Sequence, residues 1–156
     1  MISGFLRQEA LALAGITSNF LNYLERCGLV SPERIGNNRR PVVLFTWQQV
    51  LILAMIREMR EDASLQSLQA AAKFLSEQDV SCHLSENLLA IGDSVIWSGS
   101  TWEGLKSLIP HTPFRCTLTI FPPLSSILPD IEQRAKDSRA VDYEGFRARL
   151  PVAIAL

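Results

Sequence analysis

Residues 15–45 constrain the fold of this 156-residue chain more than any other segment. Apolar residues at helical spacing precede it and predict a helix over residues 7–14, which the glycine at position 15 can end in a left-handed conformation. Thr17 or Ser18 can cap a second helix, and Gly28 ends it. The start of the chain is therefore expected to hold two short helices joined by a tight turn.

A short basic hairpin is predicted after the second helix. Residues 34–35 and 42–45 favour strands, and the loop between them reads Gly-Asn-Asn-Arg-Arg-Pro, a run of turn-forming and basic residues. Helix, turn, helix and an arginine-bearing hairpin, in this order, are typical of a winged helix-turn-helix, which is a DNA-binding module.

The rest of the chain predicts two helices and then a small sheet. Helices are expected from Trp47 to about residue 61 and from a Ser64 cap to about residue 75. Residues 88–91 and 94–97 then flank a Gly-Asp pair, which suits a two-residue hairpin turn.

Four features follow this hairpin. Residues 100–103 form a capping box for a short helix. Residues 114–121 alternate as a strand, with Phe114, Cys116, Leu118 and Ile120 on one apolar face. Pro129 suits the first turn of a helix that runs to about residue 138. The apolar tail, residues 150–156, is a strand or a docking arm.

The predicted fold class is α+β. A winged helix-turn-helix domain of four helices plus a wing hairpin is expected over residues 1–79. A small α+β domain with a three- to four-stranded antiparallel sheet is expected over residues 80–156.

Charge and composition favour a DNA-binding first half. Residues 1–60 carry seven arginines and four glutamates, a net charge of +3, although the whole chain carries −1. Three unpaired cysteines argue against a disulfide framework, and no apolar run could span a bilayer. We therefore expect a cytoplasmic protein.

The second helix of such a module enters the major groove, so its early exposed side chains face the bases. Asn19 and Asn22 are expected to contact DNA, because asparagine is a poor helix former and can pair bidentately with adenine. Thr17 and Ser18 can contact bases or phosphates, or simply cap the helix.

Four further residues can supply phosphate contacts. Tyr23 either offers its hydroxyl to a phosphate or packs against the wing. Arg26 either contacts phosphate or forms an ion pair with Glu25 or Glu33, and the ion pair is favoured. Arg39 and Arg40, at the wing tip, are the strongest candidates for phosphate or minor-groove contact.

Residues 16–30 resemble the signature of MerR-type transcription regulators, which have an aromatic-Glu-Arg-x-Gly-Leu segment after a small helix-turn-helix. The matching residues here are Tyr23, Glu25, Arg26, Gly28 and Leu29, and then Ser31, Pro32, Arg34, Asn37, Arg39, Phe45, Thr46 and residues 64–68. The resemblance covers about the first half of the chain. It implies double-stranded DNA as a partner and a contact role for the aromatic residue.

The departures from this family are informative. Asn22 stands where the family commonly has an arginine that reaches DNA, and Leu24 where a second aromatic residue is usual. No apolar heptads follow Leu75, so the long helix that pairs MerR dimers is missing. Dimerisation is then expected to use the second half of the chain, and promoter occlusion is a simpler mechanism than activation.

A MerR-like head on a short second domain resembles the small cyanobacterial Cas V-K repressors of CRISPR-associated transposons. That resemblance implies a homodimeric transcriptional repressor of type V-K transposon genes, acting on an inverted-repeat promoter site. Two alternatives remain open. One is an excisionase-like architectural DNA-binding protein, and the other is a protein-interaction adaptor whose helix-turn-helix does not bind DNA.

Enzymatic and cofactor roles are not expected. The chain has two histidines and lacks the phosphate-loop, zinc-protease and serine-hydrolase motifs. Cys82, His83, His111 and Cys116 could form a two-Cys, two-His metal site, but Cys116 falls on an apolar strand face, which favours a structural thiol. We therefore predict no metal and no cofactor.

Overall fold

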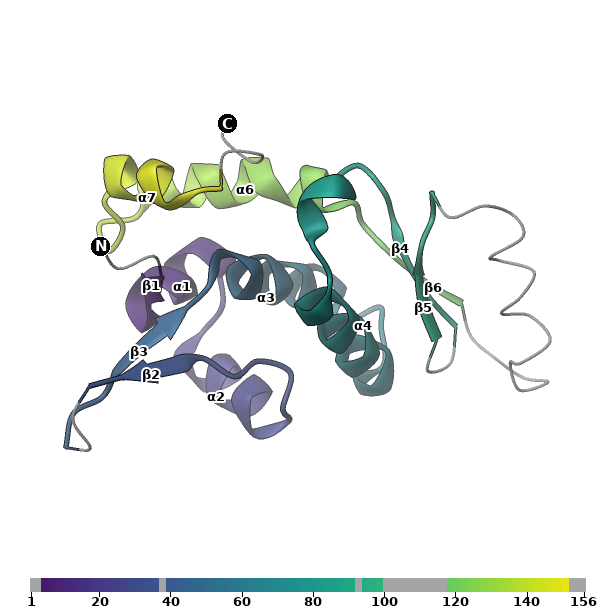
Figure 1. Cartoon of the computed structure of the whole chain (residues 1–156), viewed down its shortest axis with the longest axis horizontal. Coiled ribbons are helices and arrows are strands. Elements are labelled where there is room, and N and C mark those ends of the chain that lie inside the picture. Colours follow the sequence, from purple (N-terminus) through teal and green to yellow (C-terminus); the bar gives the residue numbers. More distant parts are fainter. Residues whose placement is uncertain (1–3, 37–38, 92–93, 100–117, 152–156) are drawn as a thin grey trace.

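The computed structural model describes residues 4–36, 39–91, 94–99 and 118–151. These residues form helices and two three-stranded antiparallel sheets, an α+β arrangement (Figure 1). The predicted helix near residues 100–103, the first part of the strand over 114–121, and the tail from residue 152 lie outside the described residues.

The first helices and the first sheet lie where the sequence predicts them. Helix α1 (Arg7–Ala14) ends at Gly15, whose φ of 69° lies in the left-handed region, and helix α2 (Ser18–Arg26) follows. Strands β2 (Glu33–Ile35) and β3 (Val42–Phe45) form the predicted hairpin. A strand that the sequence did not indicate, β1 (Phe5–Leu6), completes the sheet in the order β1-β3-β2.

Helix α3 (Trp47–Met59) is the centre of the fold. Thr46 and Gln49 form a capping box at its start, because each side chain bonds the other residue's backbone N–H. Helix α4 (Leu65–Glu77) begins at a Ser64 cap and packs against α3, and a short 3-10 helix (η1, Val80–Cys82) follows it.

The second sheet has the order β5-β4-β6. The predicted hairpin is confirmed as β4 (Leu88–Ile91) and β5 (Ser94–Trp97), with Leu88 opposite Trp97 and Ile91 opposite Ser94. Strand β6 (Leu118–Phe121) pairs with the other side of β4.

The orientation of β6 corrects one prediction. Leu118 and Ile120 were expected on the buried apolar face, but their side chains are 53% and 55% exposed. Thr119 and Phe121 face inward instead. The pairing with β4 places Thr119 beside Ala90 and Phe121 beside Leu88. Ala90 and Leu88 are almost completely buried, so the register of the sheet determines which face of β6 is buried.

Helix α6 (Leu124–Asp137) begins earlier than predicted. Pro129 lies inside this helix and not in its first turn, and Pro123 is the N-cap. A proline inside a helix removes one backbone hydrogen bond. Burial of one face of α6 compensates for that loss; its buried residues are Leu124, Ile127, Leu128, Ile131 and Ala135.

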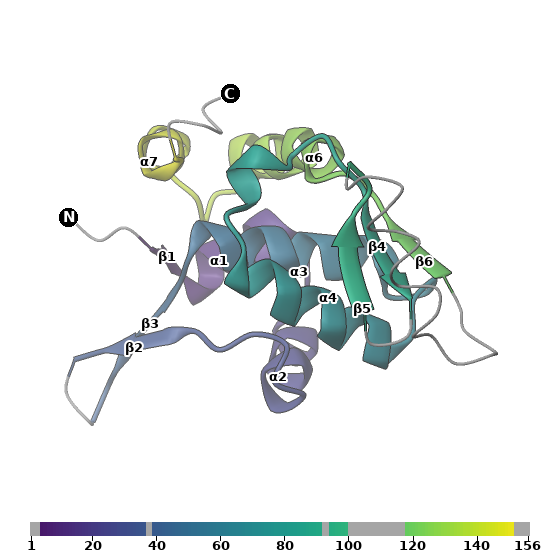
Figure 2. The same cartoon turned by 45° about the vertical axis from the view of Figure 1, so that its right-hand side comes forward.

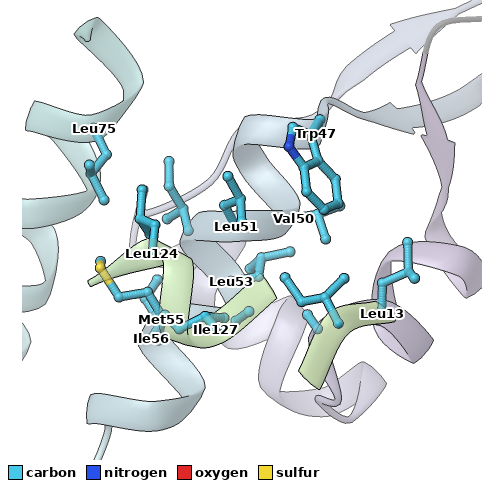
Figure 3. Packing of buried hydrophobic residues seen from close by; sticks show 14 of the residues in the cluster. Leu13, Trp47, Val50, Leu51, Leu53, Met55, Ile56, Leu75, Leu124 and Ile127 are labelled. Carbon is cyan, nitrogen blue, oxygen red and sulfur yellow. The ribbon is translucent and has the colours of Figure 1, made fainter. Parts of the chain in front are cut away.

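One hydrophobic core runs through the two halves of the chain. Figure 2 shows α6 lying over α1 and α3, which it contacts, and helix α7 (Tyr143–Arg149) lies beside it. Figure 3 shows side chains of α3 meeting Leu124 and Ile127 of α6. The core is therefore continuous across residue 79. None of the helices in the described ranges has the length and apolar character that crossing a membrane requires.

Candidate nucleic-acid interface

Helix α2 is strongly amphipathic. Leu21 and Leu24 are buried in the core, whereas the six candidate contact residues on this helix and at its cap are exposed: Thr17, Ser18, Asn19, Asn22, Tyr23 and Arg26. The Thr17 Oγ1 accepts a hydrogen bond from the Phe20 backbone N–H at 3.2 Å, so Thr17 is the helix cap. The helix thus presents a continuous polar face to solvent.

The hairpin adds two cations on the same side of the molecule. Arg39 and Arg40 are exposed between the β2 and β3 ends, Ile35 and Val42, and neither forms an ion pair or hydrogen bond with the described residues. Figures 1 and 2 both show α2 and the hairpin on the side of the molecule opposite α6 and α7. The predicted contact residues of both elements therefore share one side of the fold.

Arg7 connects α1 to α2. Its guanidinium donates to the Glu25 Oε1 at 3.0 Å, the Asn22 Oδ1 at 2.5 Å, and both the backbone oxygen and Oγ of Ser18 at 3.3 Å. Arg7 is one of the seven arginines of residues 1–60. Its contacts depend on how the helices cross, which helical periodicity does not reveal.

This network corrects the expected role of Arg26. The carboxylate of Glu25 pairs with Arg7, and the described residues contain no ion pair between Arg26 and either Glu25 or Glu33. The exposed Arg26 guanidinium is therefore available to an outside anion.

Tyr23 lies beside Phe20, with ring centroids 6.4 Å apart and planes at 16°. A hydrogen bond with Cys27 is the main cause that raises the pKa of Tyr23 above its usual value, and the Arg26 charge opposes the rise. Because such a rise means that the phenol O–H donates to Cys27, a phosphate oxygen would have to replace Cys27 as its acceptor. The ring does not cover the hairpin: it is 42% exposed and lines a cavity of about 140 Å³ between α2 and the start of α4.

Two other arginines contact α1 and α2 from neighbouring parts of the fold. The Arg60 guanidinium lies 4.5 Å from the Phe20 ring centroid, and the Arg134 Nη1 of α6 donates to the Leu13 backbone oxygen at 3.0 Å. A Cβ at position 15 would come within 2.9 Å of Arg134 Nε and would displace that guanidinium, and the φ of 69° already favours glycine there. Burial, together with the nearby Arg57, lowers the pKa of Arg134.

A buried ion pair fixes the start of α1. The two nitrogens of Arg149 donate to the two carboxylate oxygens of Glu9 at 3.0 and 2.5 Å, and the Leu6 backbone N–H donates to the same carboxylate. Burial by itself would raise the pKa of Glu9, but the bonds from Arg149 and Leu6 outweigh it and lower the pKa. Arg149 also donates to the Gly4 oxygen and lies over the Phe5 ring, so α7 holds β1 in place.

The described residues contain no group of three His, Cys, Asp or Glu side chains that could hold a metal ion. Of the four metal-ligand candidates, His111 and Cys116 lie outside the described residues, and His83 bonds to Glu86 and stacks on the Trp97 ring.

A scan of the chain against protein-family models finds no match, and a search of curated proteins finds none either. The geometry of α2 and its hairpin is therefore the basis on which a function can be assigned.

Proposed function

We propose that this chain is a sequence-specific DNA-binding transcriptional repressor that acts as a homodimer on an inverted-repeat promoter site. One observation carries the proposal. The eight candidate contact residues are all exposed, and the two elements that bear them share one side of the molecule. In this proposal residues 1–79 are a MerR-like winged helix-turn-helix, with α2 as recognition helix and the β2–β3 hairpin as wing.

The chemistry of this side suits duplex DNA. Asn19 and Asn22 offer amide groups to base edges, and the exposed guanidiniums of Arg26, Arg39 and Arg40 offer positive charge to phosphates. Because phosphate contacts position a protein and base contacts specify its site, the helix and the hairpin would divide these two tasks.

Repression fits the position of α4. This helix ends at Glu77 and is followed by η1, so it does not extend into a long pairing helix of the MerR kind. Without that fixed dimer geometry, a bound dimer would block the promoter by occupying it. The resemblance to the Cas V-K repressors suggests the genes of a type V-K CRISPR-associated transposon as its targets.

Footprinting on the DNA upstream of its own gene and the neighbouring genes tests the proposal. We expect protection of an inverted repeat that overlaps a promoter, and inhibition when the same DNA is transcribed in vitro. Protection only at an element end would favour an excisionase-like protein, and no protection would favour an adaptor. Stimulated transcription would contradict repression.

The second sheet supplies a candidate dimer surface. Its outward side carries no charge among the described residues; the apolar residues on it are Leu89, Ile91, Ile96, Leu118 and Ile120. Strand β6 is an edge strand in the described sheet, so two copies can pair their β6 strands antiparallel about a two-fold axis.

Replacing Ile120 with lysine is expected to convert the dimer to a monomer. The side chain is 55% exposed in one copy, so the change leaves the monomer fold intact, but a lysine in an apolar interface would be desolvated without a partner. Analytical ultracentrifugation measures the mass. Gln133→Lys, which adds the same charge to an exposed position of α6, should remain dimeric. A dimeric Ile120→Lys protein would exclude this surface, and a monomeric wild type would contradict the homodimer.

A further inference from the structure

Arg7 binds three residues on one face of α2. Ser18, Asn22 and Glu25 are spaced four and three residues apart, so they follow one another along the helix surface. The Arg7 guanidinium reaches all three, at 3.3 Å from Ser18, 2.5 Å from the Asn22 Oδ1 and 3.0 Å from Glu25. Asn22 is therefore held by a side chain from outside its own helix.

The position of Arg7 is itself fixed. It is the first residue of α1, and it follows the fully buried Phe5 and the Leu6 N–H that bonds Glu9. The Glu25 carboxylate pairs with its charge, and the two side chains are 30% and 24% exposed. The guanidinium is thus engaged on two sides and does not act as a free phosphate ligand.

This contact decides which end of the Asn22 amide faces outward. A guanidinium carries only donors, so the group that meets it must be the amide oxygen. The Nδ2 amino group, at the other end of the planar amide, then points away from Arg7. Asn22 is exposed, so it presents two N–H donors to an approaching ligand.

A base edge that offers two acceptors matches these donors. Bidentate pairing with adenine needs the Asn22 oxygen to accept from the adenine amino group, but that oxygen already accepts a charge-assisted hydrogen bond from Nη2 of Arg7. Guanine presents O6 and N7, both acceptors, in the major groove. We propose that Arg7 is a positioning residue that makes Asn22 select guanine over adenine, an inference that rests on the proposed DNA-binding function.

Selection of binding sites from a randomised duplex library, with the full-length chain, tests this inference. The position that Asn22 faces is the one whose base preference Asn22→Ala removes. We expect guanine there with the wild type. Arg7→Met should shift the ratio of guanine to adenine towards adenine by roughly tenfold, since one bidentate contact discriminates by about that factor or more. Arg7→Lys, which retains a donor, should keep guanine.

Two further variants test the base contact itself and control for the loss of a positive charge. Asn22→Asp retains a partner for Arg7 at an exposed site, but offers only acceptors outward, so it should select cytosine, whose N4 is a donor. Arg139→Met removes the same charge as Arg7→Met from an exposed position outside α2 and should leave the preference unchanged.

The outcomes separate the two proposals. Three results would each overturn the role of Arg7 while leaving the DNA-binding function standing. They are adenine at the Asn22 position in the wild type, a guanine preference that Arg7→Met leaves intact, and the lack of any position whose preference depends on Asn22. A wild-type protein that enriches no sequence would instead contradict the proposed function.

Discussion

Arg149→Met is expected to lower the free energy of unfolding by about 3 kcal/mol. The Arg149 and Glu9 side chains are only 17% and 11% exposed, so the substitution leaves a buried carboxylate without its main partner. It also removes the bond to the Gly4 oxygen and the contact over the Phe5 ring. Urea unfolding followed by circular dichroism measures the change. Arg139→Met, at an exposed position in the turn before α7, should change stability by less than about 0.5 kcal/mol.

The same pair predicts a pH dependence with a definite sign. The pKa of Glu9 is lower in the folded protein, so its ionised form contributes stability above its unfolded pKa, and that contribution is lost as pH falls through the folded pKa. In Arg149→Met the hydrogen bond that most lowers the pKa of Glu9 is gone, so burial raises that pKa. The loss of stability at acid pH should then shrink or reverse.

The double variant Glu9→Gln/Arg149→Met should recover part of the stability, because no unpaired charge remains. If Arg149→Met were as stable as the wild type and its stability had the same pH dependence, the Glu9–Arg149 pair would not be what holds α7 to β1.

Arg39→Ala/Arg40→Ala is expected to weaken DNA binding about equally for all sequences. If each arginine meets one phosphate, the slope of log affinity against log salt falls by about one unit per contact, or about two per protomer. At 0.1 M salt this corresponds to roughly a fifty-fold loss of affinity for each protomer. Fluorescence anisotropy over a salt series measures both quantities.

The control for the hairpin variant removes two positive charges elsewhere. Lys136→Ala/Arg139→Ala changes exposed residues at and just beyond the end of α6. Figures 1 and 2 show this helix on the side of the molecule opposite the hairpin. Its salt slope should match that of the wild type. An unchanged slope in the hairpin variant would remove the wing from the proposed interface.

The local features of the fold could be predicted because their causes are local. Thr46 starts α3 and Ser64 starts α4, since a hydroxyl side chain can accept a bond from a backbone N–H three residues later. The Gly-Asp pair correctly separated β4 from β5, and Gly15 marked the end of α1. Each signal lies within a few residues of its effect.

The contacts that hold these elements together could not be predicted. Arg149 meets Glu9 across 140 positions of sequence, and Arg7 meets Asn22 only because α1 crosses α2. The alternation in β6 showed that one face was apolar but not that the sheet would turn this face outward. Pro129 was misplaced for a similar reason, because tertiary burial of α6 outweighs the hydrogen bond that the proline removes.

The packing of Phe5 limits how freely the two halves of this chain can be exchanged. Its ring centroid lies 6.1 Å from that of Trp47 in the first half and 6.2 Å from that of Phe146 in α7. A chimera that kept residues 1–79 and replaced the rest would leave β1 without its cover, and β1 pairs directly with β3 of the hairpin. Residues 1–79 are therefore not expected to keep their structure when they are joined to a different second half. Such a chain would need another element in place of α7 to cover Phe5.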